Sequence, residues 1–229
     1  MNRFFIVISL FFLSITGRAQ FDFGIVGGMN LTSLHLDPNF FEEQRSIPRF
    51  GFSFGLGTEY RLPGNMFIHG DLNILDKNFA LNVADFYGED AIGYDRYNLL
   101  YLDLPIKFGV ELRGYRFFGG AYFDYLLDGS NLHSIEFFNT QVTKSTEHIS
   151  IGNKIAVPEP QKVFFPLEDQ FPYNAGLIVG IGHRAPGYSI DLTYSTGLIN
   201  IYPETSDPAE RNEHAMYTRV LKIELFFYL

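Results

Sequence analysis

The chain has 229 residues, a length sufficient for one or two domains. It contains no cysteine, which excludes disulfide bonds, thiolate metal ligands and a lipidated cysteine anchor. Its formal net charge of −9 argues against nucleic acid as a partner. With 25 Phe, 14 Tyr and 22 Gly beside many turn-forming residues, the composition favours an all-β fold over a helical one.

The N-terminal segment has the features of a secretory signal peptide. Arg3 precedes an apolar run over residues 4–15, which is too short to span a bilayer as a helix. Small residues precede the expected cleavage site after Ala19. We therefore expect residues 1–19 to be a cleaved signal peptide and residues 20–229 to be the exported β-barrel domain. An uncleaved membrane anchor is the alternative.

Apolar and polar residues alternate with a period of two in eight later segments. In residues 49–62, RFGFSFGLGTEYRL, large apolar side chains occupy the even positions, and most odd positions are small or polar. This alternation predicts a strand with one apolar face and one polar face. The predicted strands are residues 21–31, 49–62, 66–77, 98–112, 115–127, 171–183, 188–202 and 215–229.

The connections between these segments alternate between short and long. Tight turns are predicted at residues 63–65, 113–114 and 185–187, and long polar loops at residues 32–48, 78–97, 128–170 and 203–214. Short periplasmic turns and longer external loops are typical of outer-membrane barrels. The sequence thus predicts an all-β fold, an eight-stranded antiparallel up-and-down transmembrane β-barrel, in the outer membrane of a Gram-negative cell. Both termini are then periplasmic, and weak strand-like runs within 128–170 either extend a hairpin above the membrane or add two strands.

The composition of the two faces distinguishes this barrel from a soluble ligand carrier. The polar face is rich in Gly, Ser, Asn and Asp, which suits an interior just wide enough for side chains to fill. The opposite face is dense in Phe, Leu, Ile and Tyr, which suits lipid. We therefore expect the polar face to form the lumen.

The charges divide in the same way. Removal of Arg3 and Arg18 with the signal peptide changes the net charge from −9 to −11. The predicted strands and tight turns are neutral in sum, so the external loops carry the excess of acid. Paired charges on the lumenal face predict a packed polar plug, because an unpaired buried charge is costly. The predicted lumenal polar network comprises Glu59, Arg61, His69, Asp71, Asp103, Lys107, Glu111, Asp124, Asp191, Lys222 and Glu224.

The stretch YLDLPIKFGVEL at residues 101–112 tests this assignment, because it mixes charges and a proline with apolar residues. Its even positions are apolar and predicted to face lipid, whereas Asp103, Pro105, Lys107 and Glu111 are predicted to face the lumen. Asp103 and Lys107 are each expected to pair with a neighbouring strand. Pro105 removes one hydrogen bond from the ladder, and we expect a bulge or a lumenal group to compensate.

These residues resemble those of the Bacteroidetes outer-membrane β-barrel family that is called PorT-like. The similar stretches are FDFGIVGGMNLTSL, FGFSFGLGTEYRL, YLDLPIKFGVEL, FFGGAYFDYLL, NAGLIVGIGHR, YSIDLTYSTGLINIY and LKIELFFYL. The resemblance covers nearly the whole mature chain, and the pattern of Tyr101, Pro105 and Lys107 is its most distinctive part. It implies an outer-membrane barrel, and the namesake of the family supports protein secretion across the outer membrane.

Two candidate chemical sites have simpler explanations. His69 and Asp71 share a lumenal face and form a hydrolase triad if Ser53 or Ser195 lies across from them, but a lumenal hydrogen-bond network is favoured. Acidic pairs in the predicted loops, Glu42–Glu43 and Glu89–Asp90, suit Ca²⁺ or Mg²⁺, yet their spacing matches no known calcium loop. A solvated acidic surface is favoured there.

Tyrosines near the predicted strand ends are candidates for the aromatic girdles that flank a membrane band. The candidates are Tyr60, Tyr97, Tyr101 and Tyr202.

The sequence therefore predicts a non-enzymatic outer-membrane barrel with a structural or interaction role. No cofactor, metal or catalytic residue is expected. The expected partners are outer-membrane lipid and a protein that meets the four external loops. An accessory subunit of a secretion system, a small porin and a barrel enzyme are the alternatives.

Overall fold

A computed structural model describes residues 20–36, 44–84, 91–137, 142–149, 173–200 and 216–229, and the statements below concern these residues. They form nine β-strands in one antiparallel sheet. The strands are β1 (Gln20–Leu36), β2 (Gln44–Leu62), β3 (Met66–Ala84), β4 (Ala91–Leu112), β5 (Tyr115–Phe137), β6 (Val142–Ile149), β7 (Tyr173–Ala185), β8 (Tyr188–Gly197) and β9 (Met216–Tyr228). This part of the chain contains no helix long and apolar enough to cross a membrane. The predicted signal peptide, residues 1–19, lies outside it.

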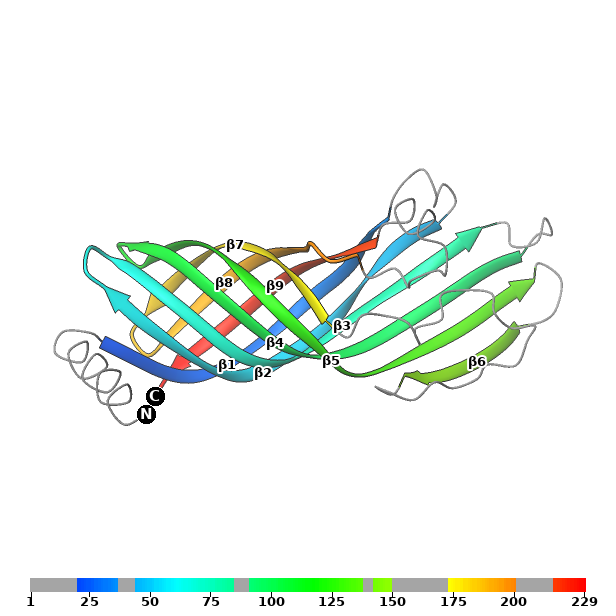
Figure 1. Cartoon of the computed structure of the whole chain (residues 1–229), viewed down its shortest axis with the longest axis horizontal. Helices are drawn as coiled ribbons and strands as arrows, with labels where there is room; N and C mark the ends of the chain where they lie inside the picture. The colour runs from blue at the N-terminus through cyan, green and yellow to red at the C-terminus, as the bar shows by residue number, and fades with distance from the viewer. Residues whose placement is uncertain (1–19, 37–43, 85–90, 138–141, 150–172, 201–215) are drawn as a thin grey trace, which may run out of the picture.

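Eight of these strands close into a barrel, which confirms the predicted fold. β5 pairs directly with β7, and β1 pairs with β9 to complete the ring. β6 stands outside the ring, because it pairs with residues 129–136 of β5, beyond the part of the same edge that β7 occupies. Figure 1 shows β6 beside the far end of β5, past the closed part of the barrel. β6 therefore extends a hairpin and adds no strand to the wall.

The three tight turns lie at one end of the barrel, here called the turn end. Arg113 (φ 55°) and Gly114 (φ 85°) both have positive φ, the signature of a two-residue type I′ hairpin. Pro186 precedes Gly187 (φ 87°), as a type II turn requires. β1 starts and β9 ends here too, since the Leu229 amide bonds to the carbonyl of Phe23. The turns fixed the strand bounds at this end close to their predicted positions.

At the opposite end, here called the loop end, the first five predicted strands were too short, whereas the strand predicted to reach residue 202 was too long, since β8 ends at Gly197. β1 reaches Leu36, β2 starts at Gln44, β3 reaches Ala84, β4 starts at Ala91 and β5 reaches Phe137. The loops predicted at residues 32–48 and 78–97 therefore begin and end within paired strands, and the loop predicted at 128–170 begins within one. The loop predicted at 203–214 falls entirely in residues 201–215, outside the described part of the chain.

The outer surface of the barrel carries a continuous apolar band. On β2, Phe50, Phe52, Phe54 and Leu56 are each more than 60% exposed, which no water-soluble strand of this length would tolerate. The other strands of the ring contribute the same kind of surface, for example Ile106 on β4 and Val179 on β7. This band is the lipid-facing surface of a membrane barrel.

The predicted girdle tyrosines divide between the two faces. Tyr97 and Tyr101 are 2% and 4% exposed inside the barrel, so their assignment to a girdle was wrong. Both occupy odd positions of β4, the positions that face the lumen. Tyr60 faces outward and packs on Phe21 with ring centroids 4.7 Å apart, whereas Tyr202 lies outside the described residues. Exposed aromatic residues near the turn end are Phe21, Tyr115, Tyr188 and Phe227.

The two faces of β3 exchange character along its length. Near the turn end, apolar side chains face outward and His69 and Asp71 face the lumen. Beyond Lys77, Phe79 and Leu81 are buried inside, while the outward position between Lys77 and Phe79 is Asn78. The apolar exterior thus runs from residue 66 to about residue 75, matching the roughly 9–11 residues of a membrane-spanning strand.

β4 shows the same exchange at the same level. Leu104 and Ile106 face outward in the band, but Asn98 and Arg96 take the outward positions nearer the loop end. The register pairs Asn98 with Asn78 of β3, so the exchange runs across neighbouring strands. Beyond it the barrel has a polar exterior and an apolar interior, as a water-soluble barrel does.

Pro105 of β4 faces the lumen and interrupts the ladder with β3. Gly70 pairs with Ile106 and Asn73 pairs with Asp103, and the two pairs between them are missing. The register is the same on both sides of the gap, so the β3–β4 ladder has no bulge at Pro105. Because proline has no N–H, a local gap in the ladder is the consequence.

Gly120 of β5 lies where β4 approaches most closely. A Cβ at Gly120 would lie 2.0 Å from the carbonyl oxygen of Ile106, a backbone atom of the barrel wall. We expect Gly120→Ala to destabilise the barrel by about 1–3 kcal/mol, the usual cost of overpacking. The measurement is the urea midpoint of unfolding in lipid vesicles. Gly119→Ala is the matched control, since its Cβ would meet its nearest atom at 3.6 Å, and equal midpoints would contradict the prediction.

Candidate functional site

The lumen holds a high density of buried charged side chains. Eight strands leave an interior that side chains can fill completely, and the inward positions of the strands supply them. The buried charged or titratable residues are Glu59, His69, Asp71, Lys77, Asp103, Lys107, Arg116, Asp124, Asp191, Lys222 and Glu224. Each is at most 7% exposed, so the pairing among them determines whether the lumen is stable.

Glu59 of β2 is the centre of the charge cluster nearest the turn end. Its Oε2 accepts a hydrogen bond of 2.7 Å from Nη2 of Arg116, and its Oε1 binds Nη1 of Arg184. Arg184 also binds Asp22 at 2.9 Å, and Arg61 binds the same carboxylate at 3.1 Å. These contacts join β1, β2, β5 and β7 across the lumen.

Arg116 is fully buried and has a partner on every side. Besides Glu59, its guanidinium donates to Oγ of Ser189 at 2.8 Å and lies 3.5 Å from Oδ1 of Asp191. The same group lies 4.3 Å from the ring centroid of Phe67, within the range of a cation–π contact. Arg116 thus connects β5 to β2, β3 and β8.

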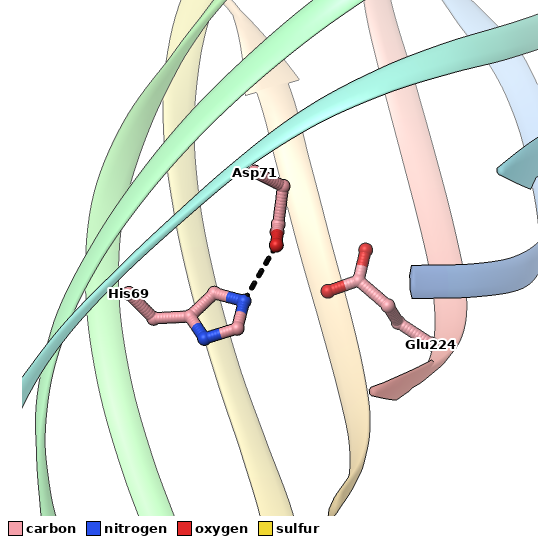
Figure 2. Close-up of side chains that lie close together, drawn as sticks. All are labelled: His69, Asp71 and Glu224. Atoms are coloured by element: carbon pink, nitrogen blue, oxygen red, sulfur yellow. Dashed lines mark hydrogen bonds and ion pairs between the residues drawn. The ribbon is translucent and has the colours of Figure 1, made fainter. Parts of the chain in front are cut away.

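His69 and Asp71 form a second cluster with Lys107 and Glu224, farther from the turn end. His69 Nε2 lies 2.7 Å from Oδ1 of Asp71, and its Nδ1 lies 3.4 Å from Oε2 of Glu59. Figure 2 shows His69 and Asp71 on one strand, with Glu224 directed at them from β9. The ammonium of Lys107 binds both Asp71, at 3.2 Å, and Glu224.

Lys222 continues this chain of ion pairs. Its Nζ lies 2.6 Å from Oε2 of Glu224 and 3.6 Å from Oδ2 of Asp103. Lys107 thus has one partner on the neighbouring strand β3, as expected, and another across the lumen on β9. The expectation for Asp103 was wrong, because its ion pair crosses the lumen to β9, which is not a neighbour of β4. In a barrel this narrow, opposite walls are within reach of a long side chain.

Lys77 and Asp124 form a third cluster, nearer the loop end. Lys77 Nζ lies 2.5 Å from Oδ2 of Asp124 and 4.8 Å from the ring centroid of Tyr122. The amide of Asn174 donates to Asp124 at 3.3 Å and to Thr218 Oγ1 at 3.0 Å. Every charged group in this cluster is therefore paired.

An apolar cluster follows these charges on the side of the loop end. We call it the apolar plug, and its buried members are Leu34, Phe79, Leu81, Tyr97, Leu99, Tyr101, Leu126 and Met216. Phe79 and Tyr97 stack within it, with ring centroids 4.9 Å apart. The lumen is therefore polar near the turn end and apolar near the loop end, whereas the sequence predicted a polar plug throughout.

A small cavity remains between the second and third clusters. Its volume is about 20 Å³, and its lining includes Lys77, Asp103, Pro105, Lys107 and Lys222. This volume is enough for about one water molecule, and the lining is polar enough to hold one.

His69, Asp71 and Glu224 have the composition of a metal site. Their nearest ligand atoms all lie within 4.8 Å of one another. The ammonium of Lys107 already contacts Asp71 and Glu224, so a cation of the protein itself stands where a metal ion would bind. Without removal of Lys107, these residues do not fit a divalent cation. The acidic loop pairs Glu42–Glu43 and Glu89–Asp90 lie outside the described residues.

The hydrolase triad is not assembled either. Both ring nitrogens of His69 face carboxylates, so neither is directed at a serine. Ser53 pairs with Leu75, six positions along β3 from His69, which is about 20 Å of strand. Ser195 lies beside Val220 on β9, four positions from Glu224.

The predicted polar network and the observed clusters overlap in large part. Arg61 and Glu111 lie at the edge of the clusters, with side chains 36% and 28% exposed. Four residues that complete the clusters were missed, namely Asp22, Lys77, Arg116 and Arg184. The alternation of inward and outward positions could have identified two of them. Lys77 occupies an odd position of β3, as the inward-facing His69 and Asp71 do, and Arg116 occupies an even position of β5, as the inward-facing Asp124 does.

Comparison with known proteins gives one family match. The family model described as "Outer membrane protein beta-barrel domain" matches residues 16–202. The comparison with curated protein sequences finds no match.

Solved structures with a similar arrangement are bacterial surface barrels. The attachment invasion locus protein Ail of Yersinia pestis, in complex with the heparin analogue sucrose octasulfate, is 8% identical with a TM-score of 0.40, covering 92% of this chain and 99% of that one. Neisserial surface protein A is 11% identical with a TM-score of 0.36, covering 90% of this chain and 97% of that one. At these identities and TM-scores, neither likeness supports an inference about function.

Proposed function

Because the chain belongs to the family of outer membrane protein β-barrel domains, we propose that it is a non-enzymatic outer-membrane barrel that presents its loop end to a partner. The chain is an outer-membrane protein by its family and by the apolar band on its exterior. The observation that carries the proposal is the filled lumen. Three charge clusters and the apolar plug occupy the interior of the described barrel, and the cavity between two of the clusters has room for about one water molecule.

A filled lumen predicts a barrel that conducts no ions. We expect the purified protein to show no stable unitary conductance in planar bilayers, because a hydrated ion does not fit a cavity of about 20 Å³. A water-filled porin of about 16–18 strands, reconstituted in the same bilayers, is the positive control. Stable conductance of the unsubstituted barrel would support the small-porin alternative instead.

The proposed topology places the turn end in the periplasm and the loop end outside the cell. Short turns support this orientation, since they are typical of the periplasmic side. Removal of residues 1–19 as a signal peptide belongs to the same proposal. N-terminal sequencing of the membrane form is expected to begin at Gln20, and an intact Met1 would favour the uncleaved anchor.

The partner is proposed to meet the loop end, where the strands rise past the apolar band. Photo-crosslinking in intact cells tests this, with the reactive residue placed at His148 of β6. Phe52 on the lipid-facing surface is the control position, which is expected to capture lipid or wall neighbours only. If position 148 yields no adduct with any protein, the interaction role fails.

A role in protein secretion rests on the PorT-like resemblance alone. The pattern of Tyr101, Pro105 and Lys107 supports membership of that branch, and all three residues lie in the lumen, where they pack the interior. Co-purification with a secretion translocon would support the accessory role, and normal secretion without the protein would remove it.

A further inference from the structure

Arg219 of β9 lies at the outer edge of the apolar band. Its neighbours Thr218 and Val220 are 2% and 3% exposed inside the barrel, so the side chain of Arg219 points outward, where it is exposed. The last apolar row on the side of the turn end contains Tyr194 and Leu221, which pair across β8 and β9. Arg219 lies two residues farther toward the loop end, a rise of about 7 Å. It is therefore placed where the hydrocarbon layer ends and the headgroups begin.

Hydroxyl side chains flank Arg219 on both neighbouring strands. The register places Thr196 of β8 and Ser33 of β1 directly opposite Arg219. Directly opposite residues share a face of the sheet, with Cβ atoms about 4.5–5.5 Å apart. One row farther toward the loop end, His35 of β1 pairs with Tyr217 of β9 on the same outer face. We call these residues, Ser33, His35, Thr196, Tyr217 and Arg219, the outer patch.

The outer patch offers hydrogen-bond donors and carries no carboxylate. A guanidinium has only N–H donors, and the side chains of Ser, Thr, Tyr and His can each donate as well. On β8, β9 and β1, the described outward positions of these rows hold neither Asp nor Glu. The whole chain, by contrast, has a formal net charge of −9. A patch of donors around one fixed positive charge favours an anion.

Arg219 differs from the arginines of the lumen in its partners. Arg116 and Arg184 each bind carboxylates inside the barrel. The side chain of Arg219 has no ion pair and no hydrogen bond within the part of the chain that the structure describes. Its donors are therefore available to a ligand from outside the chain.

Phosphate is the anion that a membrane presents at this level. A guanidinium binds phosphate through two parallel N–H···O bonds, and hydroxyl groups donate to the remaining oxygens. We propose that the outer patch binds the phosphate group of an outer-leaflet lipid. The neighbouring apolar band contacts the acyl chains of the same lipid, so the patch continues a surface that already meets lipid. The proposal rests on the outward loop end of the proposed function.

The glycolipid of the outer leaflet supplies the phosphate of higher charge. It carries phosphate monoesters, whereas membrane phospholipids carry phosphate diesters of lower charge. A phosphate monoester has a charge of about −1.5 to −2 at pH 7. Because the attraction to Arg219 grows with this charge, the patch is expected to prefer the glycolipid. Lipid A, the phosphorylated anchor of that glycolipid, is therefore the probe for the test.

The test is a titration of the purified full-length barrel in detergent with lipid A. Binding is read from the rise in the unfolding temperature, since a ligand of the folded state stabilises it. Arg219→Gln is expected to weaken the apparent affinity about fivefold, the effect of one arginine near an anionic surface. This variant is expected to fold, because Arg219 is exposed and outside the lumenal clusters. Arg113→Gln is the matched control, since it removes the same charge from an exposed residue at the turn end.

Further arms of the titration identify the ligand. Arg219→Lys keeps the charge but loses the planar fork, so its affinity is expected to lie between those of the unsubstituted barrel and Arg219→Gln. Dephosphorylated lipid A is expected to bind the unsubstituted barrel and Arg219→Gln equally. Phosphatidylglycerol is expected to bind more weakly than lipid A, and inorganic phosphate at the same concentration is expected not to displace lipid A.

Equal affinity of Arg219→Gln and the unsubstituted barrel for lipid A would overturn the proposal. Displacement of lipid A by inorganic phosphate would indicate a site for the free anion instead, and equal protection by phosphatidylglycerol would remove the assignment to the outer leaflet. The titration in detergent depends neither on topology nor on a protein partner. If position 148 yields no protein adduct, the interaction role fails and this result is unaffected, whereas failure of the titration leaves the interaction role standing.

Discussion

Replacing Arg116 with alanine is expected to lower the free energy of unfolding by about 3–5 kcal/mol, the cost of removing one partner from a buried ion pair. Arg116 is fully buried and contacts Glu59, Asp191 and Ser189. Its loss leaves the carboxylate of Asp191 without this partner in a lumen that water does not fill. The measurement is a urea titration in lipid vesicles followed by circular dichroism, since the chain has no tryptophan.

Arg61→Ala is the matched control for this variant. Arg61 lies in the same cluster and binds Asp22, but its side chain is 36% exposed. An ion pair at such a position contributes about 0–1 kcal/mol. If both variants unfold at the same urea concentration, burial does not govern the strength of the lumenal pairs.

Replacing Lys107 with alanine is expected to destabilise the barrel by a similar amount and to create a Zn²⁺ site. Lys107 separates Asp71 from Glu224, and its removal leaves two carboxylates close to His69. Imidazole and carboxylate are zinc ligands, and three protein ligands are enough when water supplies the fourth. Zn²⁺ at 100 times its dissociation constant is expected to restore about 2.7 kcal/mol.

The control for metal rescue is the unsubstituted barrel. Zn²⁺ is expected to leave its unfolding midpoint unchanged, because the ammonium of Lys107 holds both carboxylates. Lys107→Ala combined with His69→Ala should lose the recovery, and a chelator should reverse it. Equal stabilisation of the unsubstituted protein would show that zinc binds elsewhere.

The sequence predicts the barrel and its turn end well because two strong local signals coincide there. The Gly- and Asn-containing turns fix where a strand begins, and the apolar outer face makes the period of two unmistakable in segments such as 49–62. The strand ends at the loop end were missed for a physical reason. Beyond Asp76 of β3 the outside becomes polar, so the sequence has the composition of a loop although the strand continues.

The sequence predicts which side chains face the lumen, but not which of them contact one another. The odd positions of Asp103 and Lys107 in their strand indicate that both point inward. The same pattern does not identify Lys222 and Glu224 as their partners across the barrel. Those partners depend on the register in which β1 pairs with β9 to close the barrel, because this register determines which residues of β9 lie level with Asp103 and Lys107 of β4. No local sequence pattern specifies that register. The apolar plug was missed because half of its buried members, Leu34, Phe79, Leu81 and Tyr97, lay in segments assigned to loops.

The exchange of faces near Asp76 and Asn98 has a consequence for how the protein reaches its final position. The strand segments beyond this level have polar exteriors, and with the loop end outside the cell, as proposed, they must cross the hydrocarbon layer during insertion. Polar groups without partners are costly in hydrocarbon, so the barrier to insertion rises with the length of these segments and not with the width of the apolar band. Spontaneous insertion should therefore be slow, and a catalyst of translocation should accelerate it most for the long hairpin of β4 and β5. The kinetics of biogenesis are then governed by the part of the chain that does not remain in the membrane.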